Sequence, residues 1–152
     1  MDLLERCLGD LHRLLPSPLA EVVLIVAAVF AGGMVGLDRE QKGKAAGLRT
    51  VMLICVGSAV FTMFSAIIAG RSPGADPARI AAQILPGVGF LGAGAIFRGS
   101  GIGVGLTTAA TIWAVSAIGL VIGAGYAAAG LALAIVILFI LTWVQRMEGL
   151  IS

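Results

Sequence analysis

Long apolar segments separated by short polar stretches dominate this chain. Segments long enough to cross a bilayer as helices, at about 20 residues per crossing, lie at about 19–37, 50–70, 80–97, 103–123 and 126–144. The stretch 99–145 carries no charge, so it is long enough for two of these crossings joined by a turn at 123–125. The pattern predicts an all-α integral membrane protein in which residues 18–145 form a bundle of about five transmembrane helices.

A different period marks residues 1–17. Leucines recur there at helical spacing with charged residues between them, which predicts a short amphipathic helix that lies along the membrane surface. We interpret 19–37 as the first membrane helix rather than a cleaved signal peptide, because it is long and similar segments follow it. Residues 146–152 are expected to form a short cytoplasmic tail.

The composition supports this class, because 59% of the 152 residues are hydrophobic and 12% are charged, against about 25% charged residues in globular domains. The net charge is +2 and the basic residues are spread among the loops, so the expected partner is the lipid bilayer and not a nucleic acid. The single histidine, His12, and the two separated cysteines form no catalytic or metal-binding motif. We therefore expect no enzymatic activity and no resident cofactor.

The Lys and Arg content of the loops predicts the orientation in the membrane. The loop 38–49 holds four basic residues, namely Arg39, Lys42, Lys44 and Arg49. Together with the Arg98 loop and the tail, its side has six basic residues against four on the other side. We expect the N-terminus outside and the C-terminus in the cytoplasm.

Charged residues at the inner ends of the first three spans predict a contact between these helices. Asp38, Glu40, Arg49 and Arg98 all lie within a few residues of the span ends. We expect Arg49 and Arg98 to pair with Asp38 or Glu40 and so to hold the three helices together at that surface.

The third span, 80–97, differs from a segment that only has to cross lipid. It contains Gln83, Pro86 and four glycines: Gly87, Gly89, Gly92 and Gly94. Backbone polar groups at membrane depth need partners, so we expect the proline and the glycines to weaken or break this helix near mid-membrane. Two interpretations stay open: a kinked helix whose glycines allow tight packing, or an unwound segment whose carbonyls bind an ion or substrate, as in many transporters.

A polar strip leads into this span. Asp76 before Pro77 predicts a helix N-cap, and Arg79 and Gln83 share one helix face behind it. Glu21 near the outer end of the first span reaches the headgroups or, if it faces inward, pairs with Arg79. Asp76 and Glu21 are also candidate oxygen ligands for a hard cation such as Mg²⁺, although two carboxylates are too few for a tight cage.

Hydroxyl groups follow in the fourth span. Thr107 and Thr108 either bond to carbonyls one turn back or join Gln83 in a polar interior patch. Trp113 lies at mid-depth in this span, so we expect it to pack against another helix or to line a pocket.

Glycines spaced four residues apart allow membrane helices to approach closely. The pairs are Gly32 with Gly36 and Gly119 with Gly123. They serve packing inside the bundle or, as the alternative, pair two copies of the chain in a homodimer.

Three long motifs, in the same order, resemble the MgtC/SapB family of bacterial inner-membrane proteins: GGMVGLDREQKGKAAGLRT, the segment DPARIAAQ to GVGFLGAGAIFR, and GLTTAATIW. The resemblance covers about 22–125. The matching residues are Arg39, Glu40, Gly47, Leu48, Arg49 and Thr50, then Asp76, Arg79, Gln83, Gly87, Gly89, Gly92 and Gly94, then Gly105, Leu106, Thr107, Thr108, Ala109 and Trp113.

This resemblance implies a membrane domain of about five helices, a link to magnesium homeostasis and growth in low magnesium, and in pathogens survival inside host cells. It also implies regulation through another membrane protein, with the proton-driven ATP synthase as the suggested partner. Many members carry a soluble domain after the last helix, and we expect this chain to comprise the membrane domain only. The competing hypothesis is a Mg²⁺ transporter or channel built around Gln83, the broken third helix and Thr107, and a third is a purely structural component.

Overall fold

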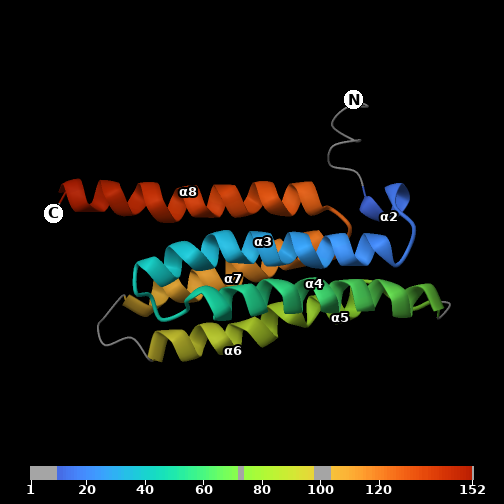
Figure 1. Cartoon of the computed structure of the whole chain (residues 1–152). Coiled ribbons are helices and arrows are strands. Elements are labelled where there is room, and N and C mark those ends of the chain that lie inside the picture. The colour runs from blue at the N-terminus through green and yellow to red at the C-terminus, as the bar shows by residue number, and fades with distance from the viewer. Residues whose placement is uncertain (1–9, 72–73, 98–103, 152) are drawn as a thin grey trace.

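The computed structural model describes residues 10–71, 74–97 and 104–151, and all of the regular structure in these ranges is helical. The helices are α2 (Leu11–Leu14), α3 (Leu19–Gln41), α4 (Leu48–Arg71), α5 (Arg79–Ala82), α6 (Ile84–Phe97), α7 (Val104–Gly123) and α8 (Ala127–Ile151). Five segments are long and apolar enough to cross a membrane, with Arg79–Phe97 counted as one. The long helices run side by side in one bundle (Figure 1). The prediction of an all-α membrane bundle is therefore confirmed.

Two helices extend beyond their predicted ends. Helix α3 continues to Gln41, so residues 38–41 belong to its last turns and not to a loop. The Lys42 Nζ to Asp38 Oδ1 ion pair, at 2.7 Å, joins residues four apart and supports this extra turn. Helix α8 continues to Ile151, so residues 146–151, expected to form a short tail, are helical.

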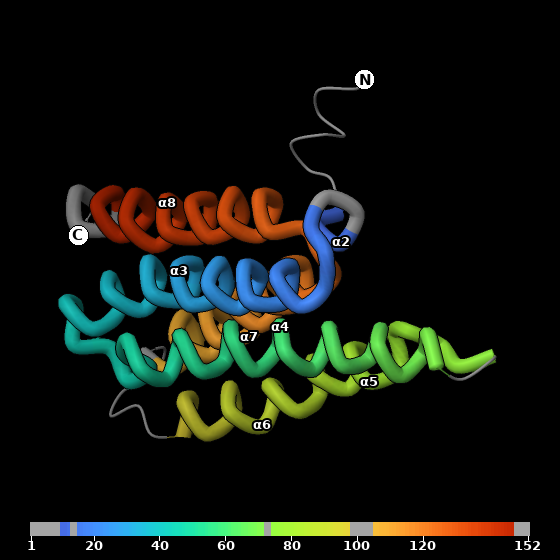
Figure 2. Tube along the Cα trace, turned by 45° about the vertical axis from the view of Figure 1, so that its right-hand side comes forward, coloured from blue at the N-terminus to red at the C-terminus, as the bar shows by residue number. Residues whose placement is uncertain are grey.

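Helix α4 packs against α3 on one side and α7 on another, with α6 beyond them and α8 at the opposite edge of the bundle (Figures 1 and 2). Both glycine pairs face α4. A Cβ atom added at Gly36 would lie 2.9 Å from the Leu48 Cα atom, and one added at Gly119 would lie 2.7 Å from the Ser58 Cβ atom. The packing interpretation of these pairs is therefore confirmed, since both faces are taken up inside the chain.

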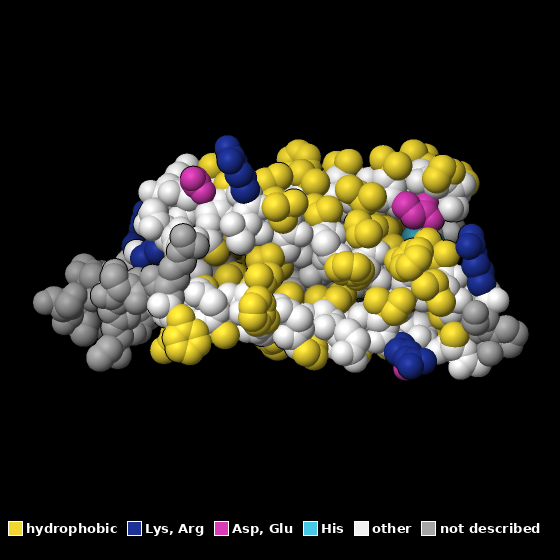
Figure 3. Space-filling view, turned by 90° about the horizontal axis from the view of Figure 1, so that it is seen from below, with side chains coloured by type: hydrophobic (Ala, Val, Ile, Leu, Met, Phe, Trp, Pro, Cys, Tyr) yellow, Lys and Arg dark blue, Asp and Glu magenta, His cyan; other side chains and the backbone are white. Residues whose placement is uncertain are grey.

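The buried core lies where α3, α4 and α7 meet. Its largest fully buried apolar side chains are Leu24 and Val35 of α3, Val51 and Cys55 of α4, and Val115, Ile118 and Ile122 of α7. Outside this core the helices expose large apolar side chains, such as Phe90 at 81% and Phe97 at 88%. Apolar side chains cover the middle of the face in Figure 3, and charged ones gather mostly toward its two ends. This distribution is that of a protein embedded in a lipid bilayer.

The interruption of the third span lies at Gln83, between α5 and α6. Pro86 has no N–H group, so the carbonyl of Ala82, four residues earlier, loses its helical donor. The N–H of Gly87 donates to the Gln83 carbonyl at 3.2 Å and continues the helix from there. The four glycines are all helical within α6, which favours a kinked helix over an unwound one, and the break lies one turn before the proline.

The end of the predicted amphipathic segment contacts the turn between α7 and α8. Residues 1–9 lie outside the described ranges, and α2 covers four residues. The Leu11 N–H donates to the Gly125 carbonyl at 3.0 Å. Gly125 has a φ of 104°, a conformation that glycine adopts without strain. The segment before α3 is thus tied to the bundle at this point.

The substitution Gly119→Ala tests whether the close approach of α7 to α4 stabilises the bundle. The added methyl group would overlap the Cys55 carbonyl and Ser58, so we expect the free energy of unfolding to fall by about 1–3 kcal/mol. The matched change Gly89→Ala adds a methyl group with no neighbouring atom within 4 Å. Its free energy of unfolding should stay equal or rise by about 0.5–1 kcal/mol. Thermal unfolding in detergent compares them, and equal midpoints would contradict the packing.

Candidate functional site

A buried arginine links two helices that are far apart in the sequence. Arg39, in the last turns of α3, is 2% exposed, and Thr108, in the second turn of α7, is also 2% exposed. The Arg39 Nη2 group donates a hydrogen bond to Thr108 Oγ1 at 2.5 Å. Because both helices pack against α4, their ends are held close enough for this contact. It is the most buried polar contact between helices that the structure shows.

The setting of Arg39 makes this contact energetically significant. A buried charge is unfavourable unless hydrogen bonds or an opposite charge compensate it. Its neighbour Asp38 binds Lys42 in an ion pair, and the buried Arg39 Nε atom has no hydrogen-bond partner in the described part of the chain. Thr108 therefore supplies the polar compensation that the structure shows for the guanidinium group.

Glu40 connects the end of α3 to the start of α4. Its Oε2 atom accepts a hydrogen bond from the Leu48 N–H at 2.8 Å, which satisfies one of the free amides at the α4 N-terminus. Gly47 makes room for this carboxylate, because a Cβ atom there would lie 3.0 Å from Glu40 Cδ and closer still to Oε2. The motif that holds Glu40, Gly47 and Leu48 is thus a helix-to-helix connection.

This contact replaces the predicted ion-pair clamp. Asp38 pairs with Lys42 and Glu40 with a backbone amide, whereas Arg49 is exposed. The expected pairing of Arg49 with Asp38 or Glu40 is therefore wrong, because each carboxylate has a nearer partner. Arg98 lies outside the described residues.

At the other end of the bundle, the predicted N-cap position of Asp76 is wrong, because α5 begins at Arg79 with Ala78 as its N-cap residue, and Asp76 instead stabilises the turn before the helix. Its Oδ1 atom accepts a hydrogen bond from the Ala78 N–H at 2.8 Å. Ser65 of α4, which the sequence analysis missed, holds the same segment in place. Its hydroxyl donates to the Pro77 carbonyl at 2.5 Å and accepts from the Ile80 N–H at 3.3 Å. A single serine in an apolar span gives no sequence signal for such a contact.

The remaining carboxylate candidate also has a local partner. Glu21 accepts a hydrogen bond from the Ser17 hydroxyl at 2.8 Å. Within the described ranges, no group of three or more His, Cys, Asp or Glu side chains is placed to hold a metal ion. The proposed metal role of Glu21 and Asp76 stays a prediction.

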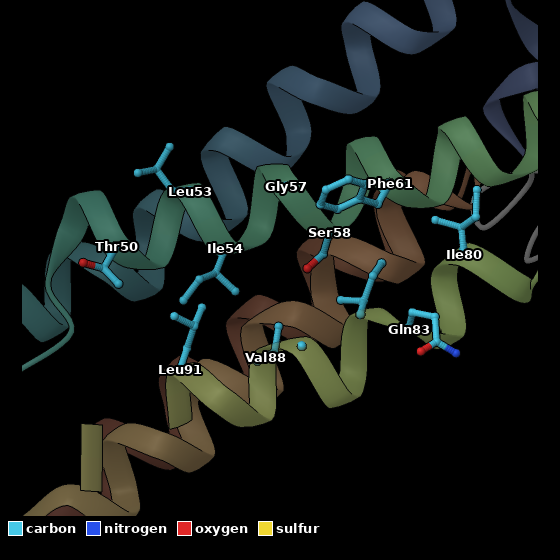
Figure 4. A pocket seen from close by; sticks show the side chains of 12 residues that line it. Thr50, Leu53, Ile54, Gly57, Ser58, Phe61, Ile80, Gln83, Val88 and Leu91 are labelled. Atoms are coloured by element: carbon cyan, nitrogen blue, oxygen red, sulfur yellow. The ribbon is translucent and has the colours of Figure 1, made fainter. Parts of the chain in front are cut away.

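Gln83 and Arg79 are both exposed, and Gln83 lies at the edge of a groove between α4 and α5–α6 (Figure 4). The cavity in this groove has a volume of about 610 Å³. Thr50, Ser58 and Gln83 bring polar side chains to its lining, and the other lining residues are apolar or glycine. Gly87 is one of the lining glycines. Gly92 of the same helix faces α7 instead, since a Cβ atom added there would lie 3.6 Å from the Ala109 Cβ atom.

The structure does not form the predicted patch of Gln83 with the two threonines. Thr108 bonds to Arg39 and Thr107 is exposed, while the Thr111 hydroxyl donates to the Thr107 carbonyl one turn back at 2.7 Å. Trp113 is 56% exposed and is not among the residues that line the groove, so the prediction that it packs against another helix or lines a pocket is not confirmed. Gly89 and Gly94 have no atom within 4 Å of an added Cβ atom and lie on the open side of α6.

Comparisons with known proteins identify relatives over most of the chain. A family model described as "MgtC family" matches residues 25–150. Protein MgtC of Brucella abortus (strain 2308) is 47% identical over 111 residues, which cover 72% of this chain and 45% of the relative. The putative magnesium transporter YhiD of Escherichia coli (strain K12) is 47% identical over 109 residues, or 68% of this chain and 51% of the relative.

Protein MgtC of Salmonella typhimurium (strain 14028s / SGSC 2262) is 44% identical over 118 residues, which cover 77% of this chain and 49% of the relative. The chain thus spans about half the length of the curated relatives it matches. No solved structure shows significant similarity to it.

The substitution Thr108→Val tests the buried contact because it removes the hydroxyl and keeps the shape of the side chain. Arg39 then loses its acceptor, so we expect the free energy of unfolding to fall by about 1–3 kcal/mol. Thr108→Ser keeps a hydroxyl and should recover most of the loss. The control Thr107→Val alters an exposed neighbour and should stay within about 0.5 kcal/mol of wild type. Unfolding by SDS in mixed micelles measures all three, and equal stability of the two valine variants would refute the contact.

A double-substitution experiment tests the connection between α3 and α4. Glu40→Ala removes the acceptor of the Leu48 amide and should lower the free energy of unfolding by about 0.5–2 kcal/mol. Glu40→Gln keeps a side-chain oxygen and should lose less. Gly47→Ala displaces the carboxylate, so it should destabilise the wild type but add little to Glu40→Ala, because both changes disrupt one contact. Additive losses in thermal unfolding would argue against this contact.

Proposed function

The chain belongs to the MgtC family, and from this premise we propose that it acts in magnesium homeostasis and adaptation to low magnesium. In this proposal it is a regulator, not an enzyme, and it works by contacting another protein of the bacterial inner membrane. The names of its relatives, MgtC and putative magnesium transporter YhiD, support the link to magnesium. The ATP synthase is the partner that the family resemblance suggests, with Mg²⁺ as a signal or ligand.

One observation supports regulation over transport. Three polar side chains of the family motifs are bound to partners within the protein: Arg39 to Thr108, Glu40 to the Leu48 amide, and Asp76 to the Ala78 amide. These contacts hold helix ends in place. Side chains that coordinate a passing ion need free oxygen atoms along a common path, and these groups are spread over both ends of the bundle and bound to protein partners.

The second candidate function is Mg²⁺ transport. It is favoured by the break at Gln83 beside the groove and by the name of the relative YhiD, a putative magnesium transporter. Magnesium requires near-octahedral oxygen coordination and gives up its waters reluctantly. The groove offers the neutral side chains of Thr50, Ser58 and Gln83, which is a small set of ligands for this ion.

The orientation that we propose follows from the basic residues at one end of the bundle. Lys42, Lys44 and Arg49 lie at the connection between α3 and α4, and cytoplasmic loops carry the excess of Lys and Arg. In the proposed orientation the α3–α4 connection and the C-terminal end of α8 lie on the cytoplasmic side, with α2 outside. A regulatory contact with the membrane part of the ATP synthase would form in the bilayer between these surfaces.

Reconstitution of the purified protein separates the two functions. In proteoliposomes that contain this protein alone, we expect Mg²⁺ and proton flux no greater than in empty liposomes. When the ATP synthase and this protein are reconstituted in the same liposomes, ATP-driven proton pumping should be at least twofold lower than in liposomes that contain the ATP synthase alone. A magnesium flux that is lost in the Gln83→Leu or Asp76→Asn protein, but not in the control Gln41→Leu, would overturn the regulatory proposal in favour of transport.

A further inference from the structure

The open side of α4 differs from its two packed sides. Gly57 of α4 and Gly87 of α6 both line the groove, and no atom lies within 4 Å of a Cβ atom added at either position. The glycines that face α3 and α7 leave no such space, as Gly36 and Gly119 show. In Figure 4 the two helix segments diverge around this space, with Ile54 and Val88 between them. The groove is therefore a gap in the packing that opens toward the bilayer.

The dimensions of the groove limit what can occupy it. Along α4 the lining runs from Thr50 to Phe61, so 61 − 50 = 11 residues at 1.5 Å each give roughly 16 Å. That is about half of the ~30 Å hydrocarbon core, or the depth of one leaflet. A single hydrocarbon chain, whose atoms pack at about 4 Å from their neighbours, is thin enough to fit.

The end of the groove at Thr50 carries positive charge. Arg49 directly precedes Thr50 in the first turn of α4 and is exposed, and Lys44 lies in the connection before it. The start of a helix also favours an anion because its first amides and its dipole point there. Two carboxylates oppose the positive charge at this end: Asp38 is paired with Lys42, and the Glu40 Oε2 atom is bound to the Leu48 amide.

We propose that this groove binds one acyl chain of an anionic phospholipid, whose phosphate group lies against Arg49. The apolar lining would hold the chain along one leaflet, and the basic end would select the headgroup. The proposal goes beyond the regulatory function and does not depend on it, because a regulator and a transporter could each carry such a lipid.

Native mass spectrometry of the purified protein, after incubation with phosphatidylglycerol or phosphatidylcholine, tests the proposal. We expect one phosphatidylglycerol per chain, retained at least tenfold more than phosphatidylcholine. Gly57→Leu fills the groove and should lower lipid retention at least tenfold, whereas Gly70→Leu, another open glycine of α4 outside the groove, should not. Arg49→Gln should remove the preference for phosphatidylglycerol, and Arg71→Gln at the other end of α4 should preserve it.

Equal lipid retention by the Gly57→Leu and Gly70→Leu proteins would overturn the proposal, and so would loss of lipid in both. If a partner protein cross-links to the groove and displaces the lipid, the lipid proposal is overturned, and the groove is a docking site for a helix of that partner. If Gly57→Leu does not fold, Gly87→Leu fills the same space from the α6 side and gives the same comparison. Flux and ATP synthase measurements play no part in this test, so its failure leaves the regulatory proposal standing.

Discussion

The close approach of α4 to α3 and α7 is the constraint on which the rest of the bundle depends. Helices in lipid gain little from burying apolar surface against each other, so van der Waals contact between closely spaced backbones stabilises them. Gly36 and Gly119 provide that contact on two sides of α4, where even a methyl group would overlap neighbouring atoms. Because α3 and α7 are both fixed against one helix, Arg39 and Thr108 are brought within hydrogen-bonding distance.

The same packing explains why the third side of α4 stays open. Two faces of the helix are covered at short distance, and α6 contacts α7 more extensively than α4. The break at Gln83 lies in the lining of this open side. Polar contacts from Ser65 to the start of α5 then hold this arrangement at one end.

Much of the fold could be predicted from hydropathy, because spans are defined by the apolar character of their own side chains. The contacts between spans could not, since the spacing of Gly32 and Gly36 defines a face but not the helix that it meets. Arg39 was expected in a loop because charges usually end a span. The helix continues through it, and the ion pair between Asp38 and Lys42 supports this extra turn. The break was predicted at the proline and the glycines near mid-membrane but lies at Gln83, because a proline disturbs the turn before it.

The N-terminal turns of α7 connect the groove side of the bundle to the buried arginine. A Cβ atom added at Gly105 would overlap the backbone of Ile96, so α6 contacts α7 without intervening side chains at this point. Thr108, three residues later, holds Arg39. A displacement of α6 must therefore either break its contact with Gly105 or move the turn that carries the acceptor of Arg39. An event on the lipid-facing side of α6 thus has a direct physical route to the end of α3 and to the basic connection that follows it.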